Sequence, residues 1–211
     1  MRRFNKDNLI LRNFEKIKDD VPLLPEMIEG SIKHCYETLD LIDQNLIAKQ
    51  VAPLAELVER ANLSSIVGNL LGAGFAEYSN GVYFRNKPHT YPDLISTKNN
   101  IPGIEIKTAL SRNSPKGHLP KAGYYLTYRY LFTDTDGNIN NLDKSMDTVS
   151  IWEVKFGFLN QECFSCSNTT GDSGKTAVIR TEALNKMLLL YFDPDLVPYK
   201  HTINHPYKGF N

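Results

Sequence analysis

An aspartate, a glutamate and a lysine in the middle of the chain have the types and spacing to bind a divalent metal. Asp93 follows Pro92, and Glu105 and Lys107 come later, in the run Gly103-Ile104-Glu105-Ile106-Lys107-Thr108. Apolar and charged residues alternate in this run, so on a β-strand Glu105 and Lys107 would share one face. Asp93 lies in another short strand, and a turn joins the two. If the strands pair as a hairpin, Asp93 comes beside Glu105.

Two carboxylates held together repel each other and need a cation. Hard oxygen ligands with open positions suit Mg²⁺, which keeps bound water and also binds phosphate; Mn²⁺ would substitute for it. The backbone carbonyl of Ile106, between Glu105 and Lys107, is a candidate third ligand. Lys107 would then contact an attacking water, while the metal stabilises the leaving oxygen. The pattern therefore predicts phosphodiester hydrolysis.

This segment resembles the motif of the PD-(D/E)xK nuclease superfamily, and its flanks resemble those of type II restriction endonucleases and mismatch-repair strand-nicking nucleases. The similarity rests on Pro92-Asp93, a short gap, and Glu105-Ile106-Lys107 with Gly103 and Thr108 on either side. It implies metal binding by Asp93 and Glu105, a lysine that assists the water, and a mixed sheet flanked by helices. The alternative is a surface hairpin whose Glu and Lys only face solvent.

Many members of this superfamily add an acid from the helix before the first strand. The candidates here are Glu56, Glu59 and Glu77, and Glu77 lies nearest the expected strand. We therefore take Glu77 as the candidate further metal ligand. A solvated surface acid is the competing interpretation for each of the three.

A stretch without acidic residues follows the candidate strand, from Ile106 through Thr133. Phosphates attract such a segment, and arginine and asparagine are suited to base edges. The alternative is a solvated basic loop with tyrosines on the sheet surface. Of the tyrosines that follow, either Tyr124 or Tyr125 is a candidate phosphate contact. The candidate DNA contacts are Ser111, Arg112, Asn113, Lys116, His118, Lys121, Tyr124 and Arg129.

The elements that must position these residues follow from hydrophobic periodicity. Residues 1–20 suggest an arm or a short helix. A long amphipathic helix is expected from Ile28 to Leu46, and further helix from Pro53 until Gly72 and Gly74 end it. Strands are expected at 81–84, 93–96, 103–108, 124–133, 149–159 and 176–180, with a helix at 181–190.

This order predicts an α/β fold with a central mixed β-sheet flanked by helices, a restriction-endonuclease-like core with an N-terminal helical region. The 211 residues fit a single nuclease domain. Within it we expect an N-terminal helical subregion at 1–54, a catalytic core at 55–192 and a C-terminal tail at 193–211.

The composition is that of a globular protein without membrane segments: the formal net charge is zero and 41% of residues are hydrophobic. The opening residues do not resemble a signal peptide, and three cysteines suit a reducing cytoplasm. Cys163 and Cys166 with His201 and His205 have the types for a zinc site, although the gap between the pairs is long.

The expected function is a Mg²⁺-dependent type II restriction endonuclease that cleaves double-stranded DNA at a specific sequence, as a homodimer or a monomer. A repair or strand-nicking nuclease with the same active site is the first alternative. A non-catalytic DNA-binding module is the second.

Overall fold

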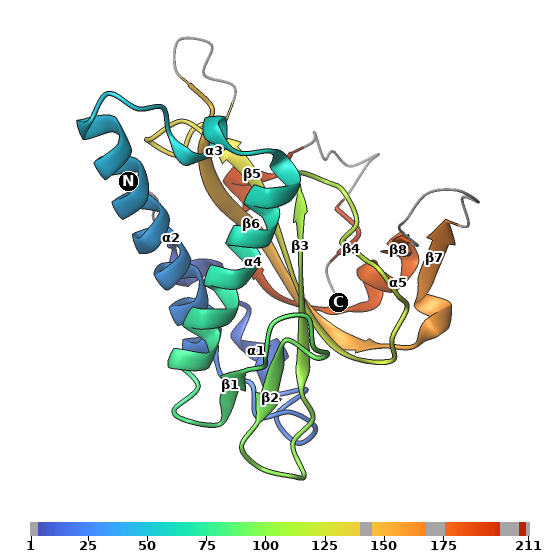
Figure 1. Cartoon of the computed structure of the whole chain (residues 1–211). Helices are drawn as coiled ribbons and strands as arrows, with labels where there is room; N and C mark the ends of the chain where they lie inside the picture. The colour runs from blue at the N-terminus through green and yellow to red at the C-terminus, as the bar shows by residue number, and fades with distance from the viewer. Residues whose placement is uncertain (1–3, 140–144, 168–175, 199–206, 210–211) are drawn as a thin grey trace.

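The computed structural model describes residues 4–139, 145–167, 176–198 and 207–209. A six-stranded sheet crosses the centre of the molecule in the order β1-β2-β3-β5-β6-β9 (Figure 1). β3 and β5 are parallel and the other neighbours are antiparallel, so the mixed sheet is confirmed. The strands are β1 (Tyr83–Arg85), β2 (Leu94–Ser96), β3 (Ile104–Leu110), β5 (Gly123–Thr133), β6 (Thr148–Leu159) and β9 (Leu188–Phe192).

One face of this sheet is covered by two long helices, α2 (Pro25–Ala48) and α4 (Arg60–Glu77) (Figure 1). Buried Val67 and Phe75 of α4 belong to the same apolar core as Ile106 and Leu126 of the sheet. The shorter α1 (Leu11–Phe14) and α3 (Leu54–Leu57) complete the expected N-terminal helical region. Since α1 and α2 share the core of the sheet, this region is part of the same packed unit.

The glycines expected to end the second helix lie inside α4, so that prediction was wrong. A Cβ at Gly74 would lie 2.6 Å from the Cβ of His34 and 2.9 Å from the carbonyl oxygen of Gly30. A Cβ at Gly72 would lie 3.2 Å from the Ile106 side chain. These glycines therefore let α4 approach α2 and β3 closely, and the helix continues to Glu77.

A smaller sheet lies on the opposite side, with the order β4-β8-β7. Its strands are β4 (Lys116–Gly117), β8 (Thr176–Ile179) and β7 (Phe164–Ser167), and only β8 was expected. Phe164 and Ile179 pack with Tyr125 of the central sheet in a second apolar cluster. Three short 3₁₀ helices complete the described chain: η1 (Lys6–Asn8), η2 (Gln161–Cys163) and η3 (Pro194–Leu196).

The helix expected at 181–190 is divided. α5 (Thr181–Lys186) ends early, and Leu188–Phe192 form β9, which pairs with β6. Four of the five β9 residues are buried, and periodicity cannot separate a short buried strand from a helix. In the expected tail, Val197 and Tyr207 are buried beside Trp152.

The search for membrane-spanning helices covered the described residues. None of those helices combines the length and the apolar character needed to cross a bilayer.

Candidate active site

The β2–β3 hairpin places the two candidate metal-binding acids side by side. Leu94 pairs with Ile104 in an antiparallel register, so Asp93 lies opposite Glu105. The backbone N–H of Ile106 donates to Asp93 Oδ2 at 2.8 Å, and the N–H of Asp93 donates to Glu105 Oε2 at 3.1 Å. The hairpin interpretation predicted that the two acids lie side by side, and these two bonds in addition fix the carboxylates relative to the backbone.

Lys107 lies beside them. Its Nζ donates to Glu105 Oε1 at 2.5 Å. Gly117 of β4 packs against the lysine: a Cβ at this glycine would lie 3.1 Å from Lys107 Cε. The smaller sheet thus confines the lysine side chain from the side opposite the helices.

Glu105 is 8% exposed and Asp93 is exposed. Burial raises the pKa of Glu105 above its ordinary value; Lys107 opposes the rise, and the charge of Asp93 adds to it. A bound cation would offset both the burial of Glu105 and the repulsion between the two acids, because a cation favours the charged form of each.

The three residues open into a cleft of about 810 Å³ along the edge of β3. β2 pairs with β3 only at Leu94 and Ile104, so no described strand lies beside the remainder of β3 on that side. Figure 1 shows α4 on one side of β3 and β4 on the other. Ile106 lines the cleft between these two walls, together with Asp93, Glu105 and Lys107.

One wall carries three of the predicted DNA contacts, Lys116, His118 and Lys121. Tyr91, two positions before Asp93, attaches this wall to the acidic hairpin. Its hydroxyl donates to the Ala122 carbonyl at 3.0 Å, and Lys121 Nζ lies 4.6 Å from its ring centroid. The basic wall is therefore tied directly to the segment that carries Asp93.

The sequence analysis did not predict the other wall. It consists of Arg85 of β1, His89 beyond that strand, and one face of α4. That face repeats small and polar residues at helical spacing, a pattern that could have identified it: Ala61, Ser64, Ser65, Gly68, Asn69 and Gly72.

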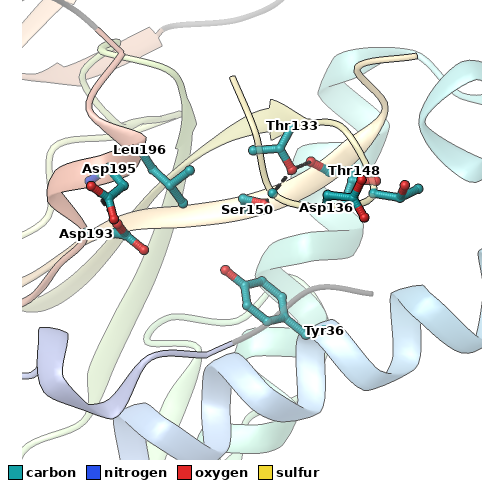
Figure 2. A pocket seen from close by; sticks show the side chains of 10 residues that line it. Tyr36, Thr133, Asp136, Thr148, Ser150, Asp193, Asp195 and Leu196 are labelled. Carbon is teal, nitrogen blue, oxygen red and sulfur yellow. Dashed lines mark hydrogen bonds between the residues drawn. The ribbon is translucent and has the colours of Figure 1, made fainter. Parts of the chain in front are cut away.

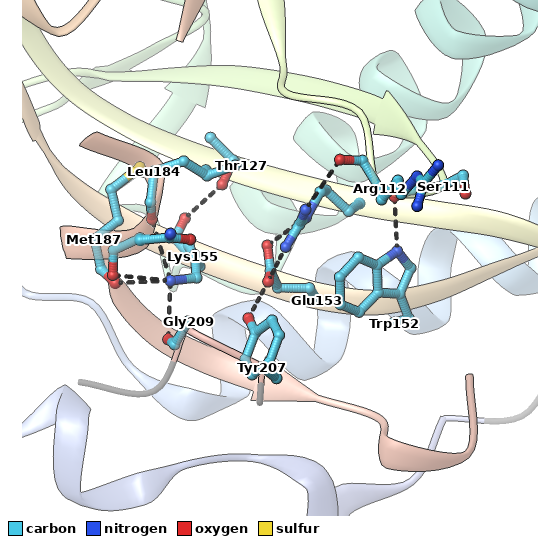
Figure 3. Close-up of polar contacts among 12 residues, drawn as sticks. Ser111, Arg112, Thr127, Trp152, Glu153, Lys155, Leu184, Met187, Tyr207 and Gly209 are labelled. Atoms are coloured by element: carbon cyan, nitrogen blue, oxygen red, sulfur yellow. Dashed lines mark hydrogen bonds and ion pairs between the residues drawn. The ribbon is translucent and has the colours of Figure 1, made fainter. Parts of the chain in front are cut away.

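Three predicted DNA contacts lie beyond the end of β3, outside the cleft lining. Arg112 and Asn113 are exposed, and Ser111 is half-buried. The carbonyl of Ser111 accepts a bond from Trp152 Nε1 at 3.1 Å, which holds this turn against β6 (Figure 3). The structure does not bring these residues together with the acids.

Two further predicted contacts, Arg129 and Tyr124, do not line the cleft. Arg129 is 6% exposed, and its guanidinium is paired with Glu153 of β6, so it is not available to a phosphate. Tyr124 lies on the helix-covered face of the sheet, where its ring stacks on Phe156 at 5.5 Å. Its neighbour Tyr125 lines the cleft but is 2% exposed.

None of the candidate helix acids lines the cleft. Glu77 is at the end of α4, where one oxygen lies 3.2 Å from His34 Nδ1. Glu56 accepts a bond from Ser145, and Glu59 is the residue before α4. In this structure the acids of the site are Asp93 and Glu105.

The structure describes only two of the four residues of the predicted zinc site. Cys163 and Cys166 are free thiols, and Cys163 Sγ lies 3.2 Å from Asn160 Oδ1. His201 and His205 lie outside the described residues. Over the described ranges, no three His, Cys, Asp or Glu side chains gather around one point.

A second cavity, of about 190 Å³, lies between α2, the paired ends of β5 and β6, and η3. Figure 2 shows Tyr36 pointing from α2 toward Ser150, with Asp193 and Asp195 nearby. The hydroxyl of Tyr36 already accepts the backbone N–H of Ile151 at 2.6 Å. This cavity is therefore bordered by groups that stabilise the fold.

The donors of the main cleft fit Mg²⁺. Two carboxylates are fixed side by side, and Asp93 Oδ1 has no hydrogen bond to any described residue. Mg²⁺ is commonly held by one or two carboxylates, water and substrate phosphate. Neither the models of known protein families nor the sequences of curated proteins match this chain.

Proposed function

We propose that this protein is a Mg²⁺-dependent endonuclease that hydrolyses phosphodiester bonds in double-stranded DNA. The observation that carries the proposal is the hydrogen-bonded pair Asp93 and Glu105, with Lys107 beside it, at an open strand edge inside a basic cleft. Each of the three residue types has a role in phosphodiester hydrolysis, and the cleft gives them access to a polymer.

In this proposal Asp93 and Glu105 hold the ion, with the Ile106 carbonyl as a candidate third ligand. When bound, Mg²⁺ supplies charge stabilisation at the phosphate. Lys107 orients the attacking water, since its ammonium is kept beside the acids by Glu105 and Gly117. Lys116 and Lys121 attract the phosphate backbone.

Site-specific cleavage, as in a type II restriction endonuclease, is the finer part of the proposal. Arg112 and Asn113 are exposed at the end of the strand that carries Glu105 and Lys107, and their side chains can bind base edges. A homodimer that cuts both strands of a palindromic site, acting in the cytoplasm, completes this proposal. Analytical ultracentrifugation with and without DNA tests the dimer.

The test of the function is digestion of plasmid and phage DNA by purified protein, with Mg²⁺ and with EDTA. Discrete Mg²⁺-dependent fragments are expected, and none from Lys107→Ala. Lys87→Ala is the matched control, because this exposed lysine does not line the cleft. Nicks or a smear would overturn site-specific cleavage. Equal cutting by wild type and Lys107→Ala would overturn the proposed active site.

A further inference from the structure

We propose that Arg85 and Asn69 form a second phosphate-binding subsite, on the α4 wall of the cleft. It would hold the backbone of the DNA strand opposite to the strand bound at Asp93 and Glu105. This inference rests on the proposed function, and it deepens that function by naming the residues that hold the second strand of the duplex.

The subsite is an oriented guanidinium. Arg85 Nη2 donates to Asn69 Oδ1 at 2.7 Å, and the residue is exposed in the cleft. An arginine has five N–H donors, and the fork that they form suits a phosphate. Asn69 uses one donor and fixes the plane of the group, so the remaining donors are directed with little loss of side-chain entropy.

The β4 wall and the α4 wall of the cleft belong to opposite faces of the sheet. Arg85 pairs with Leu94, and Leu94 with Ile104, so these three side chains share the face that α4 covers. Glu105 and Lys107 point to the other face, toward β4. The cleft joins both faces around the open edge of β3.

This arrangement matches a groove of DNA. A sheet edge with its side chains is roughly as thick as the ~10 Å spacing between packed sheets. The major groove of B-DNA is about 12 Å wide. The edge of β3 can therefore enter the groove, with one backbone near Lys107 and the other near Arg85.

Gly68, on the same face of α4, supports a close approach. A Cβ at this position would meet nothing nearer than Thr108 Cγ2, at 3.5 Å, so packing leaves room for alanine. Alanine within a helix is favoured over glycine by about 1 kcal/mol. Because Gly68 has no side chain, a DNA backbone would be able to approach α4 closely at this point.

The aromatic residues of the cleft favour a duplex over a single strand. Proteins that bind single strands stack bases on open aromatic rings. Of the two aromatic residues in the described lining, Tyr125 is 2% exposed and Tyr91 lies under the Lys121 ammonium. Unpaired bases would therefore gain little here.

The test is equilibrium binding by fluorescence anisotropy in a Lys107→Ala background, without Mg²⁺. A labelled 20-base-pair duplex and its separate strands are the probes. Arg85→Ala should raise the duplex Kd about tenfold and lower the slope of log K against log salt by about one. Single-strand affinity should change less than about twofold. Asn69→Ala should give a smaller loss, and Lys87→Ala, the control, none.

An equal loss for duplex and single strands would place Arg85 on the cleaved strand and overturn the inference. Unchanged duplex affinity, or no duplex binding by the parent, would also overturn it. If wild type cleaves DNA while Arg85→Ala binds the duplex normally, this inference fails alone. If duplex binding depends on Arg85 but wild type does not cleave, the proposed hydrolysis fails and the subsite remains.

Discussion

Two strands of the central sheet carry the same Glu-x-Lys pattern, and their environments are opposite. Glu105-Ile106-Lys107 lies on β3, and Glu153-Val154-Lys155 lies on β6. Lys107 is in register with Thr127 of β5, and Thr127 with Lys155, so both lysines point to the same face. The first pattern opens into the cleft, whereas Glu153 and Lys155 are 0% exposed.

The buried pair is satisfied by the protein itself (Figure 3). Arg129 binds both oxygens of Glu153, and the Tyr207 hydroxyl donates to one of them. Lys155 Nζ donates to backbone carbonyls that include those of Leu184 at 3.1 Å and Gly209 at 2.9 Å. Position in the sheet, more than residue type, therefore separates a candidate catalytic pair from a stabilising one.

The largest expected effect of this difference is on cleavage. Lys107→Ala should lower the rate of plasmid cleavage about 10²–10⁴-fold, because a group that assists proton transfer contributes on this scale. Asp93→Ala and Glu105→Ala should also abolish cleavage, since each removes a metal ligand. Gel assays at saturating Mg²⁺ measure the rates.

Lys155→Met is the matched control, a lysine on the same face with its charge removed. It should cleave at near the wild-type rate at a temperature where circular dichroism shows it folded. If Lys155→Met lost cleavage as fully as Lys107→Ala while folded, the two patterns would not differ in the proposed way.

The next effect is on stability. Arg129→Ala leaves Glu153 buried without its cation, which should lower the free energy of unfolding by about 3–5 kcal/mol. Urea titration followed by the fluorescence of Trp152, the single tryptophan, measures the loss. Lys107→Ala should cost less, because Lys107 is only half-buried and Glu105 keeps the hydrogen bond from the N–H of Asp93. Equal losses in the two variants would contradict the comparison.

A smaller effect is the pH dependence of stability at Lys155. Burial lowers its pKa from 10.5 to about 8, with Glu153 opposing the shift and Arg129 adding to it. Between these values the unfolded chain binds the proton and the folded chain does not, so stability rises with pH by up to about 1.4 kcal/mol per unit. The cost of the buried charge is fully present below pH 8.

The measurement is the free energy of unfolding of wild type minus that of Lys155→Met from pH 7 to pH 10.5. This difference should rise above pH 8, since the variant lacks the titrating group. A flat difference would show that the folded protein keeps the lysine protonated over this range.

The sequence predicted the features that depend on residues close together in the chain. Alternation identified β3 and its pairing with the Asp93 segment, and helical periodicity identified α2. The predicted hairpin brings Asp93 beside Glu105, and two hydrogen bonds join residue 93 to residues 105 and 106. Lys116, His118 and Lys121 line the cleft because they lie on or just after β4, which returns the chain to the side of β3.

The errors came from contacts between distant segments. Arg129 was expected to bind DNA because its own stretch lacks acids, but its partner Glu153 follows 24 positions later on β6. Gly74 was expected to end a helix, but the contact that requires glycine comes from α2. Local patterns do not contain these pairings, so the buried cluster and the α4 wall required the structure.

The smallest expected effect comes from Gly117, which confines Lys107 although it carries no functional group. Gly117→Ala would place a Cβ 3.1 Å from Lys107 Cε and shift the ammonium by a few tenths of an ångström. We expect about a tenfold loss of cleavage rate, near 1.4 kcal/mol, with duplex affinity unchanged. Ser165→Ala, at an exposed position of β7 in the same sheet, should leave the rate unaltered. In a Lys107→Ala background Gly117→Ala should have no further effect on cleavage, and an additional loss there would show that the glycine acts on the fold.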